Sequence, residues 1–167
     1  MIPEIWVWLI FLLPLGSFAV VALVVRPFFN RTSKVAGQIT VGTIAASLLL
    51  SLWALSSVIE EGGRVDLEPH RWLQVGSLEI SLGILLDPLT AIMLVVVTGV
   101  SLMVQVYSLG YMRGDPGYAR YFAFMSLFTA SMLGLVMASN IVQLYMFWEL
   151  VGVSSYLLIG FWYDRPA

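Results

Sequence analysis

Five long apolar segments constrain the fold of this chain more than any other feature of the sequence. They cover residues 5–25, 36–58, 88–109, 120–138 and 141–163, and a helix needs only about 20 such residues to cross a bilayer. Arg120 begins the fourth segment, Glu149 lies inside the fifth, and the other three carry no charge. Because a spanning segment must satisfy its backbone hydrogen bonds internally, the pattern predicts an all-α membrane protein with five transmembrane helices.

Composition agrees with this prediction and narrows the possible functions. The 167 residues are 60% hydrophobic and 11% charged, whereas soluble domains carry about 25% charged residues. The chain has no cysteine and a single histidine, His70, so thiolate metal sites and iron–sulfur clusters are excluded. The net charge is −2, without a basic run. We therefore expect a lipid bilayer as partner, no nucleic acid, and neither a cofactor nor a metal in this chain.

The breaks between the segments carry local signals for turns and helix ends. Asp87 followed by Pro88 predicts an N-cap with proline at the first helical position. Asn140 predicts an N-cap for the last segment, and Gln143 lies three residues on, as in a capping box. Residues 113–117, Arg-Gly-Asp-Pro-Gly, predict a tight polar turn.

Basic residues predict the orientation in the membrane, because cytoplasmic loops are richer in lysine and arginine. One side holds only Arg64 and Arg71, among several carboxylates. The other side is expected to be cytoplasmic, which places the N-terminus outside and the C-terminus inside a cell (inner or plasma) membrane. The basic residues of that side are Arg26, Arg31, Lys34, Arg113, Arg120 and Arg165.

The outside loop, residues 60–87, has the pattern of strands and not of a helix. Apolar and polar residues alternate on both sides of Gly76-Ser77, a dipeptide typical of type II′ hairpin turns. We expect a β-hairpin-like loop between the second and third helices; an ordinary ordered loop is the alternative. In that hairpin, pairing Val75 with Leu78 places Leu73 opposite Ile80.

Small residues recur every four positions in the fourth segment. Such a stripe lets a second helix approach closely, although small residues also recur by chance in membrane helices. The stripe consists of Ser126, Ala130, Gly134 and Ala138.

Glu149 is the most informative single residue. It lies nine residues after Asn140, about 13 Å along a helix and near the middle of a hydrocarbon core of about 30 Å. A charge at that depth costs at least about 2.5–3.5 kcal/mol. We expect its helix face to point into a bundle and not at lipid, because that face is small and partly polar. The face also carries Tyr145, Gly152, Tyr156 and Gly160.

Two interpretations of Glu149 remain open from the residues alone. Glu149 is either a carboxyl group that takes up and releases protons or a member of an ion pair that only locks helices together. In the first case, burial would raise its proton affinity and a nearby lysine would lower it. The only lysine, Lys34, lies outside all five segments. A cationic partner must come from another chain or from sequence beyond these residues.

Three stretches of the sequence resemble one known family. They are residues 86–98 (LDPLTAIMLVVVT), 110–124 (GYMRGDPGYARYFAF) and 147–161 (FWELVGVSSYLLIGF). In this order they resemble the N-terminal part of the large antiporter-like subunit of respiratory complex I, the L-type subunit, which is chain 5 in mitochondria and the F-type subunit of photosynthetic relatives. The resemblance covers essentially the whole chain.

The resemblance implies a membrane subunit of a proton-translocating NADH (or ferredoxin):quinone oxidoreductase. It implies other membrane subunits of that complex as partners and redox chemistry located outside this chain. Glu149 matches the family's fifth-helix glutamate, which pairs with a lysine on the seventh helix and takes part in proton transfer. Residues 60–87 match the family's outside hairpin.

The family has many more helices than five. We therefore expect residues 1–167 to be the N-terminal transmembrane part of an antiporter-like subunit, either a fragment of a longer chain or a truncated gene, that conducts no protons by itself. Two alternatives remain. One is the large subunit of a multisubunit cation/proton antiporter, which shares these motifs. The other is a purely structural membrane piece.

Overall fold

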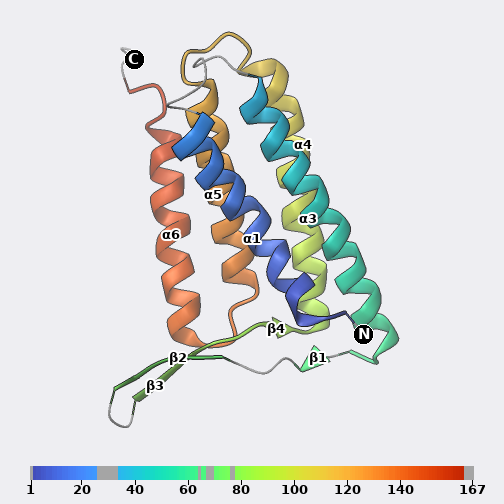
Figure 1. Ribbon diagram of the computed structural model, residues 1–167. Helices are drawn as coiled ribbons and strands as arrows, with labels where there is room; N and C mark the ends of the chain where they lie inside the picture. Colours follow the sequence, from blue (N-terminus) through green and yellow to red (C-terminus); the bar gives the residue numbers. More distant parts are fainter. Residues whose placement is uncertain (1, 26–33, 64, 67–69, 76–77, 164–167) are drawn as a thin grey trace.

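Five long helices make up most of the structure, a computed structural model that describes residues 2–25, 34–63, 65–66, 70–75 and 78–163. Among these residues, five helices are long and apolar enough to cross a membrane, and they stand side by side in Figure 1. The prediction of an all-α membrane protein with five spans is confirmed. The helices are α1 (Glu4–Val20), extended by the π-helical turn η1 (Val21–Val25), α3 (Val35–Glu60), α4 (Pro88–Tyr111), α5 (Tyr118–Val136) and α6 (Ile141–Ile159).

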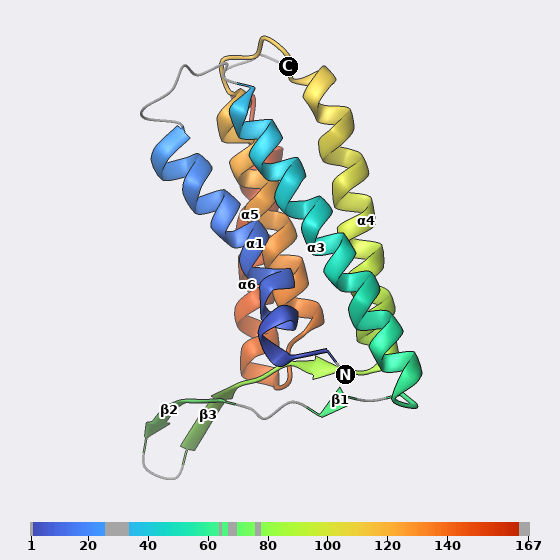
Figure 2. The same ribbon diagram turned by 45° about the vertical axis from the view of Figure 1, so that its right-hand side comes forward.

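Helix α5 is the centre of the bundle. It contacts α1, α3, α4 and α6, whereas α6 packs mainly against α5. The second view shows the same arrangement, with α3 alongside α4 (Figure 2). The core has one cluster at each end of the bundle. Leu94 and Leu133 belong to the cluster near the strands, and Met112 and Phe122 belong to the cluster at the opposite end.

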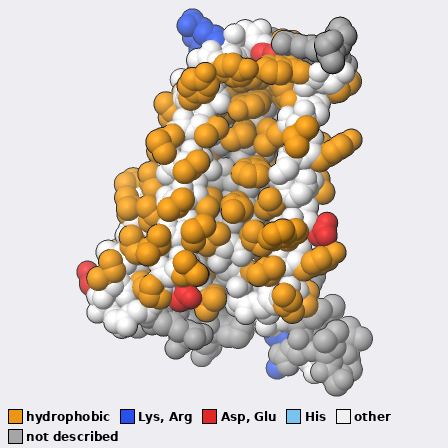
Figure 3. All heavy atoms as spheres, turned by 180° about the vertical axis from the view of Figure 1, so that it is seen from behind, with side chains coloured by type: hydrophobic (Ala, Val, Ile, Leu, Met, Phe, Trp, Pro, Cys, Tyr) orange, Lys and Arg blue, Asp and Glu red, His pale blue; other side chains and the backbone are white. Residues whose placement is uncertain are grey.

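The outside of the bundle is apolar, and its interior contains polar side chains among the apolar ones. Large side chains such as Leu89 and Met103 are exposed, whereas Thr98 and Ser108 are buried on the same helix. Hydrophobic side chains cover the helices between the two ends of the molecule in Figure 3. A lipid environment explains this arrangement, and the protein is an integral membrane protein.

The predicted caps are present, with one difference. The Asp87 carboxylate accepts from the backbone N–H of Thr90 at 2.7 Å, and the Asn140 side chain accepts from the N–H of Gln143 at 2.9 Å. The Gln143 amide oxygen, however, accepts from the N–H of Gly83 at 3.3 Å in place of completing a capping box. Asn140 also donates to the carbonyl of Ser81 at 2.7 Å. Both side chains therefore tie α6 to the loop before α4.

The loop between α3 and α4 contains the predicted hairpin. Strands β2 (His70–Val75) and β3 (Leu78–Leu82) are antiparallel, with Val75 opposite Leu78 and Leu73 opposite Ile80, which confirms the predicted register. The turn residues 76–77 lie outside the described part of the chain. Strands β1 (Val65–Asp66) and β4 (Leu85–Leu86) pair nearer the helices, and the hairpin projects beyond the bundle in both ribbon views (Figures 1 and 2).

The last helix is shorter than the sequence pattern indicates. It ends at Ile159, whereas the apolar segment continues to residue 163. Gly160 is the C-cap residue, and two long-range contacts follow it. The Arg120 guanidinium donates to the carbonyl of Phe161 at 2.9 Å, and the Trp162 indole donates to Asp115 at 3.1 Å. These contacts turn the chain back onto the start of α5.

The predicted small-residue stripe on α5 lies in the interior. Ser126 and Ala130 are fully buried. A Cβ added at Gly134 would overlap the ring of Phe147 on α6, so the prediction that another helix approaches this face is confirmed at Gly134. Ala138, at the end of the stripe, forms an isolated β-bridge with Ile84.

Candidate functional site

Glu149 lies near the middle of α6. It is eight residues from the first residue of the helix and ten from the last, or about 12 Å and 15 Å at 1.5 Å per residue. This agrees with the depth inferred from the sequence. The side chain is exposed on an otherwise apolar spanning helix.

The face of α6 that carries Glu149 is turned away from the other described helices. Tyr145 is 63% exposed and Tyr156 is 75% exposed. The opposite face contacts α5: Ser154 is fully buried, and the Phe147 ring fills the space beside Gly134. The expectation that the Glu149 face points into a bundle is not met within this chain, because α5 occupies the other face of the helix.

A polar group lies one helical turn from the carboxyl group. The hydroxyl of Tyr145 interacts with Glu149, as side chains four residues apart on a helix do. None of the lysine, arginine or histidine residues in the described part forms an ion pair with Glu149. The carboxyl group therefore lies on an open face at mid-span, without a cationic partner among the described residues.

Another contact between titratable groups lies on the surface near the hairpin. His70 Nε2 lies 2.8 Å from Glu4 Oε1, and the Trp8 indole donates to the same oxygen at 2.9 Å. This contact links β2 to the start of α1. Within the described residues, no group of three or more histidine, cysteine, aspartate or glutamate side chains could hold a metal ion.

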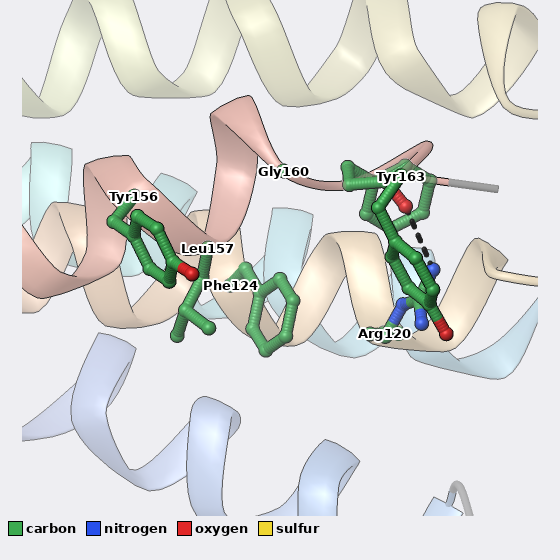
Figure 4. A pocket seen from close by; sticks show the side chains of 7 residues that line it. Arg120, Phe124, Tyr156, Leu157, Gly160 and Tyr163 are labelled. Atoms are coloured by element: carbon green, nitrogen blue, oxygen red, sulfur yellow. Dashed lines mark hydrogen bonds between the residues drawn. The ribbon is translucent and has the colours of Figure 1, made fainter. Parts of the chain in front are cut away.

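A pocket lies between α5 and the C-terminal end of α6, and Figure 4 shows its lining. Arg120 lies at one end, beside Tyr163, and Phe124 and Leu157 line the middle. The guanidinium carbon of Arg120 is 4.7 Å from the centre of the Phe161 ring. The lining contains no carboxylate, and the arginine acts here as an anchor for the end of α6.

Comparisons with known families match two stretches of the chain. Residues 72–122 match a family described as "NADH-Ubiquinone oxidoreductase (complex I), chain 5 N-terminus". Residues 138–167, which include Glu149, match one described as "NADH:quinone oxidoreductase/Mrp antiporter, TM".

Individual relatives agree with these matches. NAD(P)H-quinone oxidoreductase subunit 5 from Zygnema circumcarinatum chloroplasts is 46% identical over 97% of this chain. NAD(P)H-quinone oxidoreductase chain 5 from Synechocystis sp. is 45% identical over 96% of it. The chain belongs to the NAD(P)H-quinone oxidoreductase chain 5 family. It spans 23% and 24% of the length of these two members, so the activity of a whole chain 5 protein extends to these residues only as a proposal.

Solved structures give the same fold. A chain of the Mrp complex from Dietzia sp. superposes with a TM-score of 0.70 at 27% identity, over 92% of this chain and 16% of that one. A chain of an archaeal membrane-bound sulfane sulfur reductase, described as a respiratory membrane complex, superposes with a TM-score of 0.65 at 23% identity, over 90% of this chain and 22% of that one. The chain 5 family fold is thus shared with antiporter and respiratory assemblies.

Proposed function

We propose that these residues form the N-terminal transmembrane part of a membrane subunit of a proton-pumping NADH (or ferredoxin):quinone oxidoreductase, with Glu149 as a proton-transfer group. The observation that carries the proposal is the position of this carboxylate. It lies at mid-span on a face of α6 that the described helices leave open, in a family whose members are named quinone oxidoreductase subunits.

An ionisable group in a membrane interior is costly unless it is paired or reaches water. A lysine on a later helix, packed against the open face of α6, would hold Glu149 ionised. When the positive charge moves away, the low dielectric of the site favours the neutral acid, and the carboxyl takes up a proton. Tyr145, one turn away, would orient the carboxylate toward that partner or toward water.

In this proposal the electron-transfer chemistry belongs to other subunits. Glu149 contributes a proton site, and other subunits bind the flavin, the iron–sulfur centres and the quinone. The partners are further membrane subunits of the complex, together with lipid around the exposed apolar helix faces.

Purification of the intact assembly tests this assignment. An affinity tag on a full-length chain that carries these residues should recover subunits with flavin and iron–sulfur centres after mild solubilisation, identified by mass spectrometry and by their absorption spectra. A tagged, unrelated multi-pass protein from the same membrane serves as the control. Recovery of small antiporter subunits without redox centres would overturn the assignment in favour of a cation/proton antiporter, the candidate supported by the likeness to the Mrp complex.

We also propose that the N-terminus and the β2–β3 hairpin lie outside and the C-terminus lies in the cytoplasm. The excess of arginine and lysine at the end of the bundle opposite the strands supports this orientation. The chain has no cysteine, so single cysteines can report on each side. Glu60→Cys, at the end of α3, should react with an impermeant thiol reagent on intact cells, and Pro116→Cys should react only after lysis. The reverse pattern would show the opposite orientation.

A further inference from the structure

The buried face of α4 is a polar seam, defined here by Thr98, Ser101, Gln105 and Ser108, all of which are buried. Most buried hydroxyls of the bundle satisfy themselves within their own helix. Thr98 donates to the carbonyl of Leu94, and Ser108 to that of Val104, each at 2.7 Å. Such bonds to the preceding turn are the usual solution for serine and threonine inside a helix.

The side chain of Gln105 forms no such hydrogen bond. Its side chain is completely buried, yet neither its amide oxygen nor its amide nitrogen has a hydrogen-bond partner among the described residues. The hydroxyl of Ser126 on α5 is in the same condition. Native proteins rarely leave buried amides and hydroxyls unpaired, and the cost is greatest where no solvent can reach them.

The register between α4 and α5 brings these two residues to the same level. Thr129 donates to Ser101 at 3.1 Å, and Ser108 and Tyr121 are hydrogen-bonded at 3.1 Å. These contacts define an antiparallel pair of helices. Gln105 lies between Ser101 and Ser108 on the same face of α4, and Ser126 lies one turn before Thr129 on α5.

We propose that water binds between Gln105 and Ser126, where the polar seam of α4 meets α5. Water both donates and accepts, so bound water can donate to the amide oxygen or accept from an amide N–H group of Gln105 and also pair with the Ser126 hydroxyl. Gln105 is six residues from the C-terminal end of α4, roughly 9 Å along the helix axis. The water site is therefore nearer the Arg113 end of the bundle, and it is separate from the open face that carries Glu149.

The proposal does not depend on the function assigned to Glu149, and its test is direct. A cryo-EM map of the intact complex, at a resolution that shows ordered water, should contain water density within hydrogen-bonding distance of both Gln105 and Ser126. A map in which the Gln105 amide bonds directly to Ser126 or to a helix carbonyl, without such density, would overturn it.

A double variant provides the control. Gln105→Leu combined with Ser126→Ala keeps the helices closely packed and removes all the polar partners, so the water density should be lost. Density that persists in the double variant would show that other groups hold the water and would overturn the assignment to Gln105 and Ser126. The waters elsewhere in the two maps indicate whether their quality is comparable.

Discussion

Replacing Glu149 by glutamine in a full-length chain is expected to stop most proton pumping while the complex still assembles. Glutamine keeps the shape of the side chain and removes its titration. A positioned acid–base group typically contributes roughly 100-fold or more to a proton-transfer step, so a loss of that order is expected for this step. Assembly should survive because α6 is attached to the bundle through its opposite face, at Phe147 and Ser154. Pumping and quinone reduction would be measured in proteoliposomes that contain the purified complex.

Two further variants show whether the loss comes from titration. Glu149→Asp keeps the acid and shortens its reach by one methylene, so the defect should be milder. Glu60→Gln removes a carboxylate at the end of α3, outside the middle of the membrane, and should pump normally. If a fully assembled Glu149→Gln complex pumps at the normal rate, Glu149 is a structural ion-pair partner and the proposed proton role is wrong.

Replacing Gly134 by leucine is expected to separate α5 from α6. The added side chain would occupy the position of the Phe147 ring, and overpacking of this kind typically costs about 1–3 kcal/mol. Because α6 rests mainly on α5, the thermal midpoint and the yield of the assembled complex should both fall. Thermal unfolding of the purified complex, followed by size-exclusion chromatography, measures the effect.

The matched control is the same substitution at Gly99 on α4, where an added Cβ has nothing within 4 Å. Gly99→Leu should change stability little, and Leu135→Ala, next to the stripe, should matter less than Gly134→Leu. Equal tolerance of leucine at Gly134 and Gly99 would contradict the close approach of α5 and α6.

Local chemistry made most of the fold predictable. The spans follow from uninterrupted apolar runs, and their starts follow from caps such as Asp87 and Asn140, which act over three residues. The hairpin register follows from the two-residue period of a strand: once Val75 faces Leu78, Leu73 must face Ile80. Such features depend on neighbours in sequence, and sequence patterns are informative about them.

Features set by distant contacts were not predictable in the same way. After α6 the chain is held by Arg120, which donates to the carbonyl of Phe161, 41 positions further along the chain. The depth of Glu149 follows from counting residues, but the direction of its face depends on where α5 packs. The sequence shows Gln105 as an uncharged amide in an apolar run. Only the packed helices show that its side-chain amide has no hydrogen-bond partner among the described residues.

The two ends of α6 are fixed differently from its middle. Asn140 and Gln143 attach one end to the segment before α4, and Phe161 and Trp162 attach the other end to the start of α5. A helix held at both ends cannot slide along its own axis relative to the bundle, although its middle can move sideways. The height of the Glu149 carboxyl group relative to the other described helices is therefore set by these contacts, and its lateral distance from a proton donor or acceptor is what a partner helix can adjust.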